Sequence, residues 1–191
     1  MAKRRNGGRR AARSVRVCAV VSRYNATVTE RLLEGAARAF AERFEGVEGA
    51  ELEVVHAPGA FELPALCLAA ARAGFDAVVA LGCLIRGETI HDRVIADAVA
   101  QGLVNVTIVT GVPVTFGVLT VNTPEQALAR AGGAEGNKGA DAMHAALDVV
   151  AAARVLEDGE GWVSVEEGEL VKPGLASRTE SRDKLKRSPR R

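Results

Sequence analysis

The chain has 191 residues, of which 48% are hydrophobic and 26% charged, and its formal net charge is +1. This length and composition suffice for one ordinary core, which excludes a fibrous or wholly disordered protein. No apolar run of about 18 residues lacks charge, and no apolar signal region follows the basic N-terminus, so we expect a cytoplasmic protein without a membrane segment.

The first segment of the chain, 1–14, is basic. Seven basic residues and no acidic one occur in 1–16, whereas 17–156 has ten bases and sixteen acids. We expect 1–14 to be a disordered, solvated arm. Binding of nucleic acid is the weaker alternative, because no aromatic residue is interleaved to stack on bases, so we expect no nucleic-acid partner.

Apolar runs of strand length then alternate with Ala-rich amphipathic stretches. The predicted strands are 17–22, 50–56, 77–84 and 104–110, with a further extended piece at 114–119. This alternation is typical of a parallel sheet covered by helices on both faces. The predicted fold is α/β, a three-layer α/β/α doubly wound, flavodoxin-like sheet with four main parallel strands.

Start and stop signals mark the helices between these strands. The signals are a capping box at Thr27 and Glu30, Pro64 in the first turn before 66–73, Thr89 as cap of 90–101 with Gly102 at its end, Thr123 before a short helix toward Ala131, and Asn137 as cap of a helix to about Leu156. The domain is expected to span 15–156, followed by a polar, disordered tail at 157–191.

Three cysteines lie far apart in this sequence and form no CxxC. Cys18, Cys67 and Cys83 are therefore expected to be buried thiols and not a disulfide framework or zinc site. No second histidine or cysteine stands at ligand spacing from His91, so no metal site is predicted.

Polar and glycine-containing clusters follow the predicted strands at 23–25, 58–62, 86–91 and 113–116. Because the carboxyl ends of parallel strands meet at one edge of a sheet, these clusters predict a small-molecule site there. Backbone N–H groups at 87–89 could hold a phosphate, although an ordinary helix cap is equally compatible with this tripeptide. There is no GxGxxG and no GxxxxGK[ST] sequence, which excludes the common dinucleotide and P-loop motifs.

Several side chains at this rim could contribute chemistry. His91 in a first helical turn could transfer protons, and Glu62 could accept hydrogen bonds from hydroxyls, but each could also be a structural helix-start residue. Arg130 and Lys138 flank a glycine-rich joint and could bind an anion or remain solvated. The aromatic residues Tyr24, Phe61 and Phe116 could stack on a flat ring.

Taken together, these motifs resemble the 6,7-dimethyl-8-ribityllumazine synthase family. The motifs are SRYN at 22–25, PGAFELP at 58–64, IRGETIH at 85–91, PVTFGVL at 113–119, and EQA, RAG and GNKG between 125 and 139. The resemblance spans roughly 15–155 and implies an enzyme of riboflavin biosynthesis without metal or organic cofactor. An amine of 5-amino-6-(D-ribitylamino)uracil would attack the ketone of 3,4-dihydroxy-2-butanone 4-phosphate, phosphate would leave, and the second amine would close the ring with loss of water.

The resemblance also implies a role for each residue at the rim. His91 and Lys138 would be catalytic, with His91 moving protons. The substrate-binding set would be Tyr24 and Asn25 at the pyrimidine, Ala60, Phe61 and Glu62 at the ribityl chain, Leu84 and Ile85 at the uracil edge, Gly87, Glu88 and Thr89 with Arg130 at the phosphate, and Phe116. Phe116, Arg130 and Lys138 are expected to serve the site of a neighbouring subunit.

The resemblance also implies an oligomer, and the sequence differs from the family pattern at a few positions. The family forms pentamers, and the short joint at 132–138 resembles that of members whose pentamers close into a 60-subunit shell; riboflavin synthase is a further expected partner. Tyr24 stands where the family usually has Phe or Trp, and Asp92 and Arg93 stand where an aromatic residue and an acid are commoner. The alternative is a non-catalytic shell or carrier that binds flavin or lumazine.

Overall fold

The structure is a computed structural model that describes residues 14–158, 164–166 and 169–171. The chain divides into two compact units, 1–150 and 151–191. The predicted arm and most of the predicted tail lie outside the described residues, so the expectation of disorder there stays a prediction.

The first unit is built on a four-stranded sheet. Its strands are β1 (Val15–Ser22), β2 (Ala50–Ala57), β3 (Ala77–Ile85) and β4 (Val114–Val121). The order across the sheet is β2-β1-β3-β4, and every neighbouring pair is parallel. The two central strands, β1 and β3, are almost wholly buried, which agrees with their largely apolar sequences.

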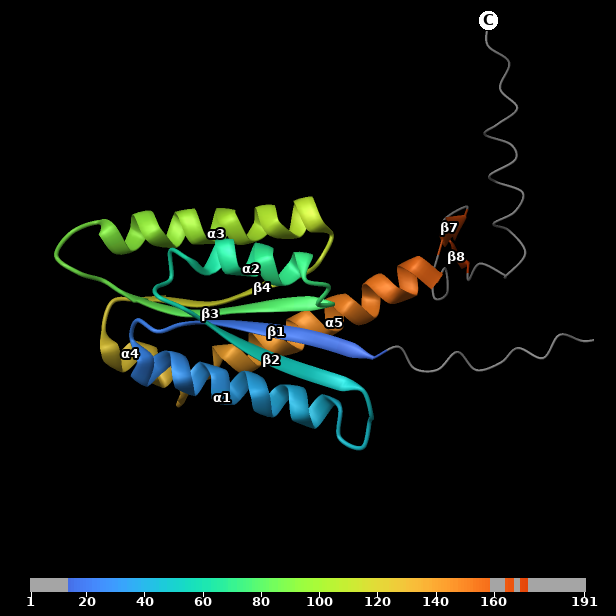
Figure 1. The fold of residues 1–191 in the computed structure, drawn as a ribbon, viewed down its shortest axis with the longest axis horizontal. Coiled ribbons are helices and arrows are strands. Elements are labelled where there is room, and N and C mark those ends of the chain that lie inside the picture. Colours follow the sequence, from blue (N-terminus) through green and yellow to red (C-terminus); the bar gives the residue numbers. More distant parts are fainter. Residues whose placement is uncertain (1–13, 159–163, 167–168, 172–191) are drawn as a thin grey trace, which may run out of the picture. The chain divides into compact units, whose positions relative to one another are not determined.

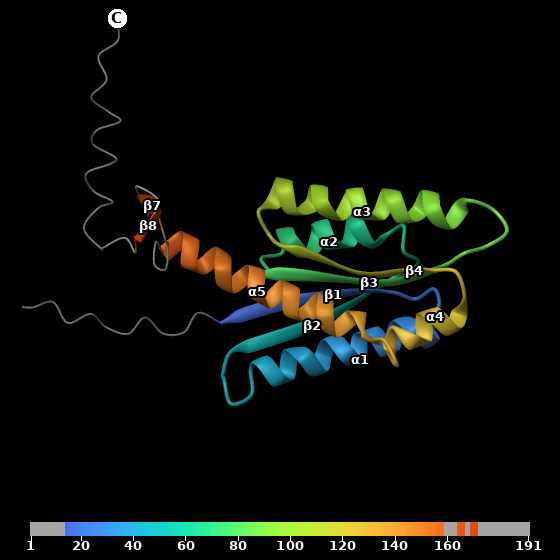
Figure 2. The same ribbon diagram turned by 180° about the vertical axis from the view of Figure 1, so that it is seen from behind.

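Helices cover both faces of this sheet (Figures 1 and 2). The helices are α1 (Ala26–Arg43), α2 (Leu63–Arg72), α3 (His91–Thr110), α4 (Pro124–Ala129) and α5 (Lys138–Asp158). Helices α2 and α3 lie on one face, and α1, α4 and the part of α5 up to Val150 lie on the other. This is the three-layer arrangement that the sequence predicts.

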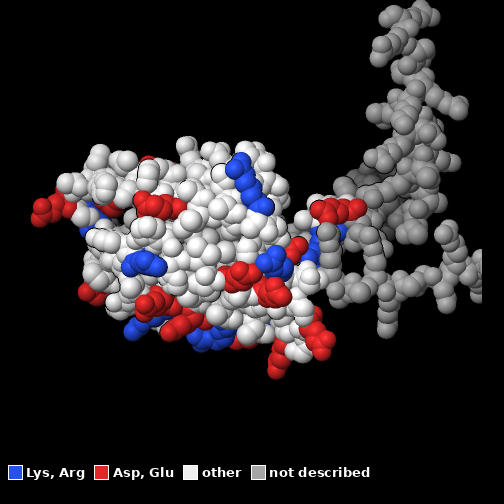
Figure 3. All heavy atoms as spheres, in the orientation of Figure 1, with Lys and Arg blue, Asp and Glu red and all other residues white. Residues whose placement is uncertain are grey.

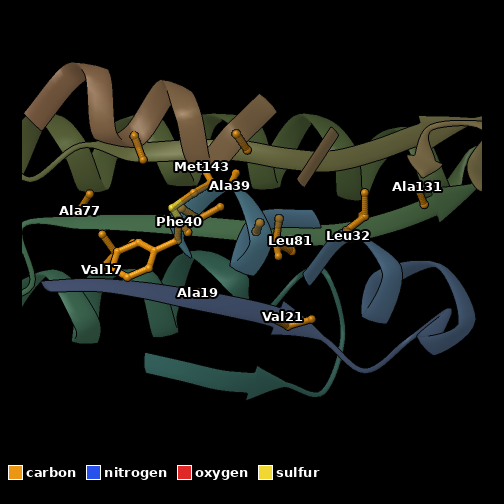
Figure 4. Packing of buried hydrophobic residues seen from close by; sticks show 14 of the residues in the cluster. Val17, Ala19, Val21, Leu32, Ala39, Phe40, Ala77, Leu81, Ala131 and Met143 are labelled. Carbon is orange, nitrogen blue, oxygen red and sulfur yellow. The ribbon is translucent and has the colours of Figure 1, made fainter. Parts of the chain in front are cut away.

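Successive side chains of β1 point to opposite faces of the sheet, and they divide the hydrophobic core into two clusters. Val17 and Val21 point toward α1 and α5, where they join Leu32 and Met143 (Figure 4). Val20 points the other way, into a cluster under α2 and α3. Because both faces of β1 are covered, nearly every side chain of this strand contributes to burial.

The prediction of a strand at 104–110 was wrong, because these residues form the second half of α3. Their β-branched side chains favour strands only where a pleated surface is available to pack on. Here Val99, Leu103 and Val106 recur at helical spacing and are buried, and the Thr110 hydroxyl donates to the Val106 carbonyl at 2.6 Å. The helix ends at Gly111, whose φ of 73° suits glycine.

Gly102, predicted as the end of this helix, lies inside it. A Cβ at this position would lie 2.7 Å from Pro64 Cγ and 2.8 Å from Pro64 Cβ. Gly102 therefore permits a close approach of α3 to α2 and does not terminate the helix.

The helix caps were predicted with mixed success. Thr123 and Asn137 cap α4 and α5 as expected: the Thr123 hydroxyl accepts from the Gln126 N–H, and Asn137 Oδ1 accepts from the Gly139 N–H at 2.8 Å. The capping box at Thr27 is not formed, because α1 begins earlier, at Ala26. Thr89 is not the cap of α3 either, although its Oγ1 accepts from the His91 N–H at 3.4 Å.

A short antiparallel pair that the sequence analysis did not predict joins α4 to α5. It consists of β5 (Ala131–Gly133) and β6 (Gly136–Asn137). The second unit contains residues 151–158 of α5 and an antiparallel pair of strands, β7 (Ser164–Glu166) and β8 (Glu169–Val171).

Of the described helices, α3 alone has the length and apolar composition of a membrane-spanning helix. Its exposed side chains include Val94, Val104, Ile108 and Val109. In Figure 3 most of the surface over α2 and α3 carries no charged side chain. The buried side chains of the same helix pack on the sheet. The helix is therefore apolar on two faces, one buried against the sheet and one exposed.

Candidate active site

Loops that follow β1, β2 and β3 meet in one cavity of about 710 Å³. We call this cavity the rim pocket. It is lined by Tyr24, Asn25, Gly59, Ala60, Phe61, Glu62, Cys83, Leu84, Ile85, Gly87, Thr89, His91, Asp92, Val94 and Ile95. Three of the four predicted polar clusters therefore converge, at the carboxyl ends of the strands where ligands of doubly wound sheets bind.

The rim pocket combines a closed floor with an open mouth. Ala60 and Leu84 are buried, whereas the rings of Tyr24 and Phe61 are 69% and 61% exposed. Two flat rings at the mouth can stack on a planar ligand at little conformational cost. The pocket therefore suits a molecule with a flat ring, provided that the mouth is then covered.

Asn25 fixes the wall of the pocket next to β1. Its φ of 59° and ψ of 45° place it in the left-handed region, which Asn tolerates better than most residues. The paired residues of β1 and β3 end at Val21 and Leu81, and two positions farther along β3 the Cys83 carbonyl accepts from Asn25 Nδ2 at 2.8 Å. One side-chain amide thus continues the hydrogen bonding between the strands, and Asn25 Oδ1 remains the atom of this amide that can accept from a ligand.

Three of the four predicted phosphate-binding residues belong to the loop between β3 and α3, and two of these three reach the pocket. Gly87 and Thr89 line it, whereas Glu88 is exposed and lies outside the lining. The Arg86 N–H donates to the Val121 carbonyl at 2.8 Å, which ties the loop to the end of β4. A Cβ at Gly87 would meet nothing within 4 Å, so space for a ligand remains beside this backbone.

His91 is the first residue of α3 and is exposed at the rim pocket. Its backbone is positioned by the bond to Thr89, while its imidazole is free of any side-chain hydrogen bond among the described residues. An imidazole in this position can exchange protons with a bound ligand.

Cys83 lies in the floor of the pocket but is a poor nucleophile. Burial raises the pKa of its thiol to about 11, so the thiol is protonated at neutral pH. Cys83 contributes its carbonyl oxygen to the site through Asn25. Among the described residues, no three His, Cys, Asp or Glu side chains are grouped so that they could hold a metal ion.

Three further predicted residues line a second cavity of about 490 Å³ along β4, which we call the β4 pocket. Phe116, Arg130 and Lys138 line it, and none of its lining residues lines the rim pocket. The Lys138 N–H donates to the Arg130 carbonyl at 2.9 Å, so the two cations are held at the β5–β6 joint. Lys138 Nζ also lies 2.7 Å from Asp141 Oδ2.

The two cavities divide the predicted site within one protomer. All but Glu88, Phe116, Arg130 and Lys138 of the predicted residues line the rim pocket. Gly59, Cys83, Asp92, Val94 and Ile95 also line it but were not predicted. Gly59 and Cys83 belong to strand-end segments already singled out, and helical spacing from His91 could have found Val94 and Ile95.

Comparisons with known proteins point to one family. The model of the family described as 6,7-dimethyl-8-ribityllumazine synthase matches residues 14–154. The chain is 48% identical over 147 residues to the 6,7-dimethyl-8-ribityllumazine synthase of Thermus thermophilus, covering 76% of this chain and 90% of that protein. It is 49% identical over 142 residues to the protein of the same name from Kineococcus radiotolerans, covering 73% and 86%.

Proposed function

The chain belongs to the 6,7-dimethyl-8-ribityllumazine synthase family, and we propose that it condenses 5-amino-6-(D-ribitylamino)uracil with 3,4-dihydroxy-2-butanone 4-phosphate. Members of this family are transferases of riboflavin biosynthesis. The observation that carries the proposal for these substrates is the convergence of three post-strand loops in one pocket with exposed rings, carboxylates and a histidine.

The rim pocket binds the amine substrate in this proposal. Tyr24 stacks on the pyrimidine, and Asn25 Oδ1 accepts from its edge while Nδ2 stays on Cys83. Ala60, Phe61 and Glu62 hold the ribityl chain, because an exposed carboxylate beside a backbone turn can accept from several hydroxyls. The uracil edge lies against Leu84 and Ile85.

The phosphate of the second substrate binds at the start of α3. Backbone N–H groups at Gly87, Glu88 and Thr89 lie at the positive end of the helix dipole, which favours an anion. Although Glu88 lies outside the pocket lining, its backbone can still donate. Arg130 from the β4 pocket of a neighbouring subunit would supply a side-chain cation, because Arg86, the basic residue of this loop, does not line the rim pocket.

The reaction needs proton transfer and positioning more than strong acids or bases. The primary amine attacks the ketone, forming a C–N bond, and the oxygen of the carbinolamine leaves as water after protonation. Removal of a proton from the adjacent carbon then expels phosphate by breaking its C–O bond and leaves an enol, which tautomerises to a ketone. The second amine attacks this ketone, and loss of another water closes the ring. His91 moves the protons and Lys138 stabilises developing negative charge, while the site holds two reactants in contact.

Oligomerisation accounts for the division of the site. The family implies an oligomer, and the proposed form is a pentamer in which the rim pocket of one protomer faces the β4 pocket of the next. Exposed Val94, Val104, Ile108 and Val109 on α3 would be covered by such contacts. Closure into a 60-subunit shell, association with riboflavin synthase and a cytoplasmic location complete the proposal.

The direct test is to mix the purified protein with the two substrates and follow lumazine absorbance and fluorescence. The expected result is a rate well above the slow uncatalysed condensation, with a sedimentation coefficient of a pentamer or larger. A rate equal to that background, in protein shown to be folded and oligomeric, would overturn the proposed function and favour a binding role. Sedimentation as an active monomer would overturn the shared site alone.

A further inference from the structure

Asp92 begins the inward-facing stripe of α3. Later members of this stripe are Val99, Leu103 and Val106, which stand seven, eleven and fourteen residues after Asp92 and are buried. At 3.6 residues per turn, these spacings place all four side chains on one face of the helix. A carboxylate therefore occupies the end of a stripe whose later positions pack against apolar side chains.

One oxygen of this carboxylate receives no hydrogen bond from any residue that the structure describes. Asp92 Oδ1 is buried and lacks a partner within the part of the chain that the structure describes. A buried carboxylate oxygen without a donor is unfavourable, because it has lost its bonds to water and gained none. The first turn of a helix favours an acid electrostatically, but the helix supplies no donor to Oδ1.

The same side chain lines the rim pocket, between His91 and Ile95 in the sequence. A turn of the carboxyl group would bring its unpaired oxygen to this pocket, where a ligand could supply the missing donor. A phosphate at this point would face a carboxylate and be repelled, whereas an N–H or O–H group would be attracted. The pocket already contains Glu62, so Asp92 adds a second acceptor on a different wall.

We propose that Asp92 accepts a hydrogen bond from a donor group of the amine substrate, a ring N–H or a ribityl hydroxyl, and so orients that substrate in the rim pocket. This inference rests on the proposed function, since it takes the donor-rich substrate to be the occupant of the pocket. Asp92 is then a specificity residue for the amine substrate and not for the phosphate ester.

The test compares Asp92→Ala and Asp92→Asn with a matched control, Asp97→Ala, in the assembled full-length protein. Asp97 lies on the same helix, is exposed and lines neither pocket. Calorimetry gives the Kd for ribitylaminouracil, and steady-state rates give the KM for each substrate. Asp92→Ala is expected to raise the Kd and KM for the amine at least about tenfold, the usual effect of losing a bond to a charged group.

Other readouts separate this role from a structural one. The KM for the butanone phosphate should change less than about threefold, and Asp92→Asn should recover part of the amine affinity because it keeps an acceptor oxygen. Asp97→Ala should bind like the unaltered protein. Because Asp92→Ala removes a buried unpaired oxygen, it should not lower the free energy of unfolding.

A ligand without the ribityl chain, 5,6-diaminouracil, identifies the donor. If its Kd rises in Asp92→Ala as much as that of the full substrate, the donor is on the ring. If its Kd is unchanged while the full substrate binds more weakly, the donor is a ribityl hydroxyl. Both results support the proposal and distinguish its two sources.

Two results would overturn it. Unchanged amine affinity in Asp92→Ala, with the unaltered protein fully active, would leave the proposed function intact and refute the role of Asp92. Dissociation of Asp92→Ala into smaller species, with unchanged amine affinity, would show that a neighbouring subunit supplies the donor. An unaltered protein that neither binds the amine nor forms lumazine would refute the proposed function itself.

Discussion

Replacing Asn25 separates two contributions to the wall of the rim pocket. Its amide donates to the Cys83 carbonyl at 2.8 Å across a partly buried position, and its φ is 59°. Loss of the donor leaves the carbonyl unpaired, which costs about 1–2 kcal/mol at such a position. Alanine at positive φ adds about 1–2 kcal/mol, a penalty that glycine does not incur.

The expected order of stability is therefore the unaltered protein, then Asn25→Gly, then Asn25→Ala. Asn25→Gly should lose about 1–2 kcal/mol, with a small further loss from the flexibility of glycine in the unfolded chain, and Asn25→Ala about 2–4 kcal/mol. Both variants should also raise the KM for the amine substrate, because the wall that carries Tyr24 is no longer tied to β3.

Urea unfolding followed by circular dichroism measures these differences, at one protomer concentration because assembly shifts the midpoint. Asn122→Ala, at an exposed asparagine outside both pockets, is the control and should be near neutral. Equal losses for Asn25→Gly and Asn25→Ala would refute the backbone contribution. An unchanged free energy of unfolding in both variants would refute the contribution assigned to the hydrogen bond between Asn25 and the Cys83 carbonyl.

Proton transfer, thiol burial and helix packing each lead to a further prediction. His91→Ala should lower kcat by about 100-fold or more and leave the Kd for the lumazine product nearly unchanged, as measured by fluorescence titration; unchanged kcat would exclude it as the proton carrier. Burial raises the pKa of the thiols of Cys18, Cys67 and Cys83 to about 11, 12 and 11, so they should react with Ellman's reagent only after denaturation. Since the unfolded chain loses thiol protons first, the free energy of unfolding should fall as pH rises above about 9; stability that rises there would contradict this. Gly102→Ala should destabilise the fold in urea by about 1 kcal/mol, because overpacking against Pro64 exceeds the gain in helix propensity; a stabilised variant would contradict the close approach.

The parallel sheet was predictable chiefly from its two central strands, β1 and β3, which are largely apolar and buried. Alternation of these runs with Ala-rich helices predicted β1, β3 and the three layers. The second half of α3 was not predictable from the same rule, since Val104 and Ile108 have the side chains of a strand. The helix is indicated by the spacing of Val99, Leu103 and Val106, which follow one another at intervals of four and three residues. Gly102, which lies among them, instead suggests the end of a helix.

The candidate site was predictable in its composition and less so in its geometry. Strand ends come together at one edge of any parallel sheet, so the loops at 23–25, 58–62 and 86–91 could be grouped without coordinates. That Glu88 lies outside the rim pocket and Asp92 inside it depends on where α3 begins. A shift of one residue in that start turns a side chain by about 100° around the helix.

The separation of the rim pocket from the β4 pocket has a genetic consequence on the proposed assembly. A protomer with a defective His91 still carries an intact Arg130, and one with a defective Arg130 still carries an intact His91. A ring that mixes the two therefore contains some junctions where both intact halves meet. Two inactive alleles expressed together would complement each other, and a protomer defective only at Arg130 would inactivate the site of its neighbour while its own rim pocket stays intact.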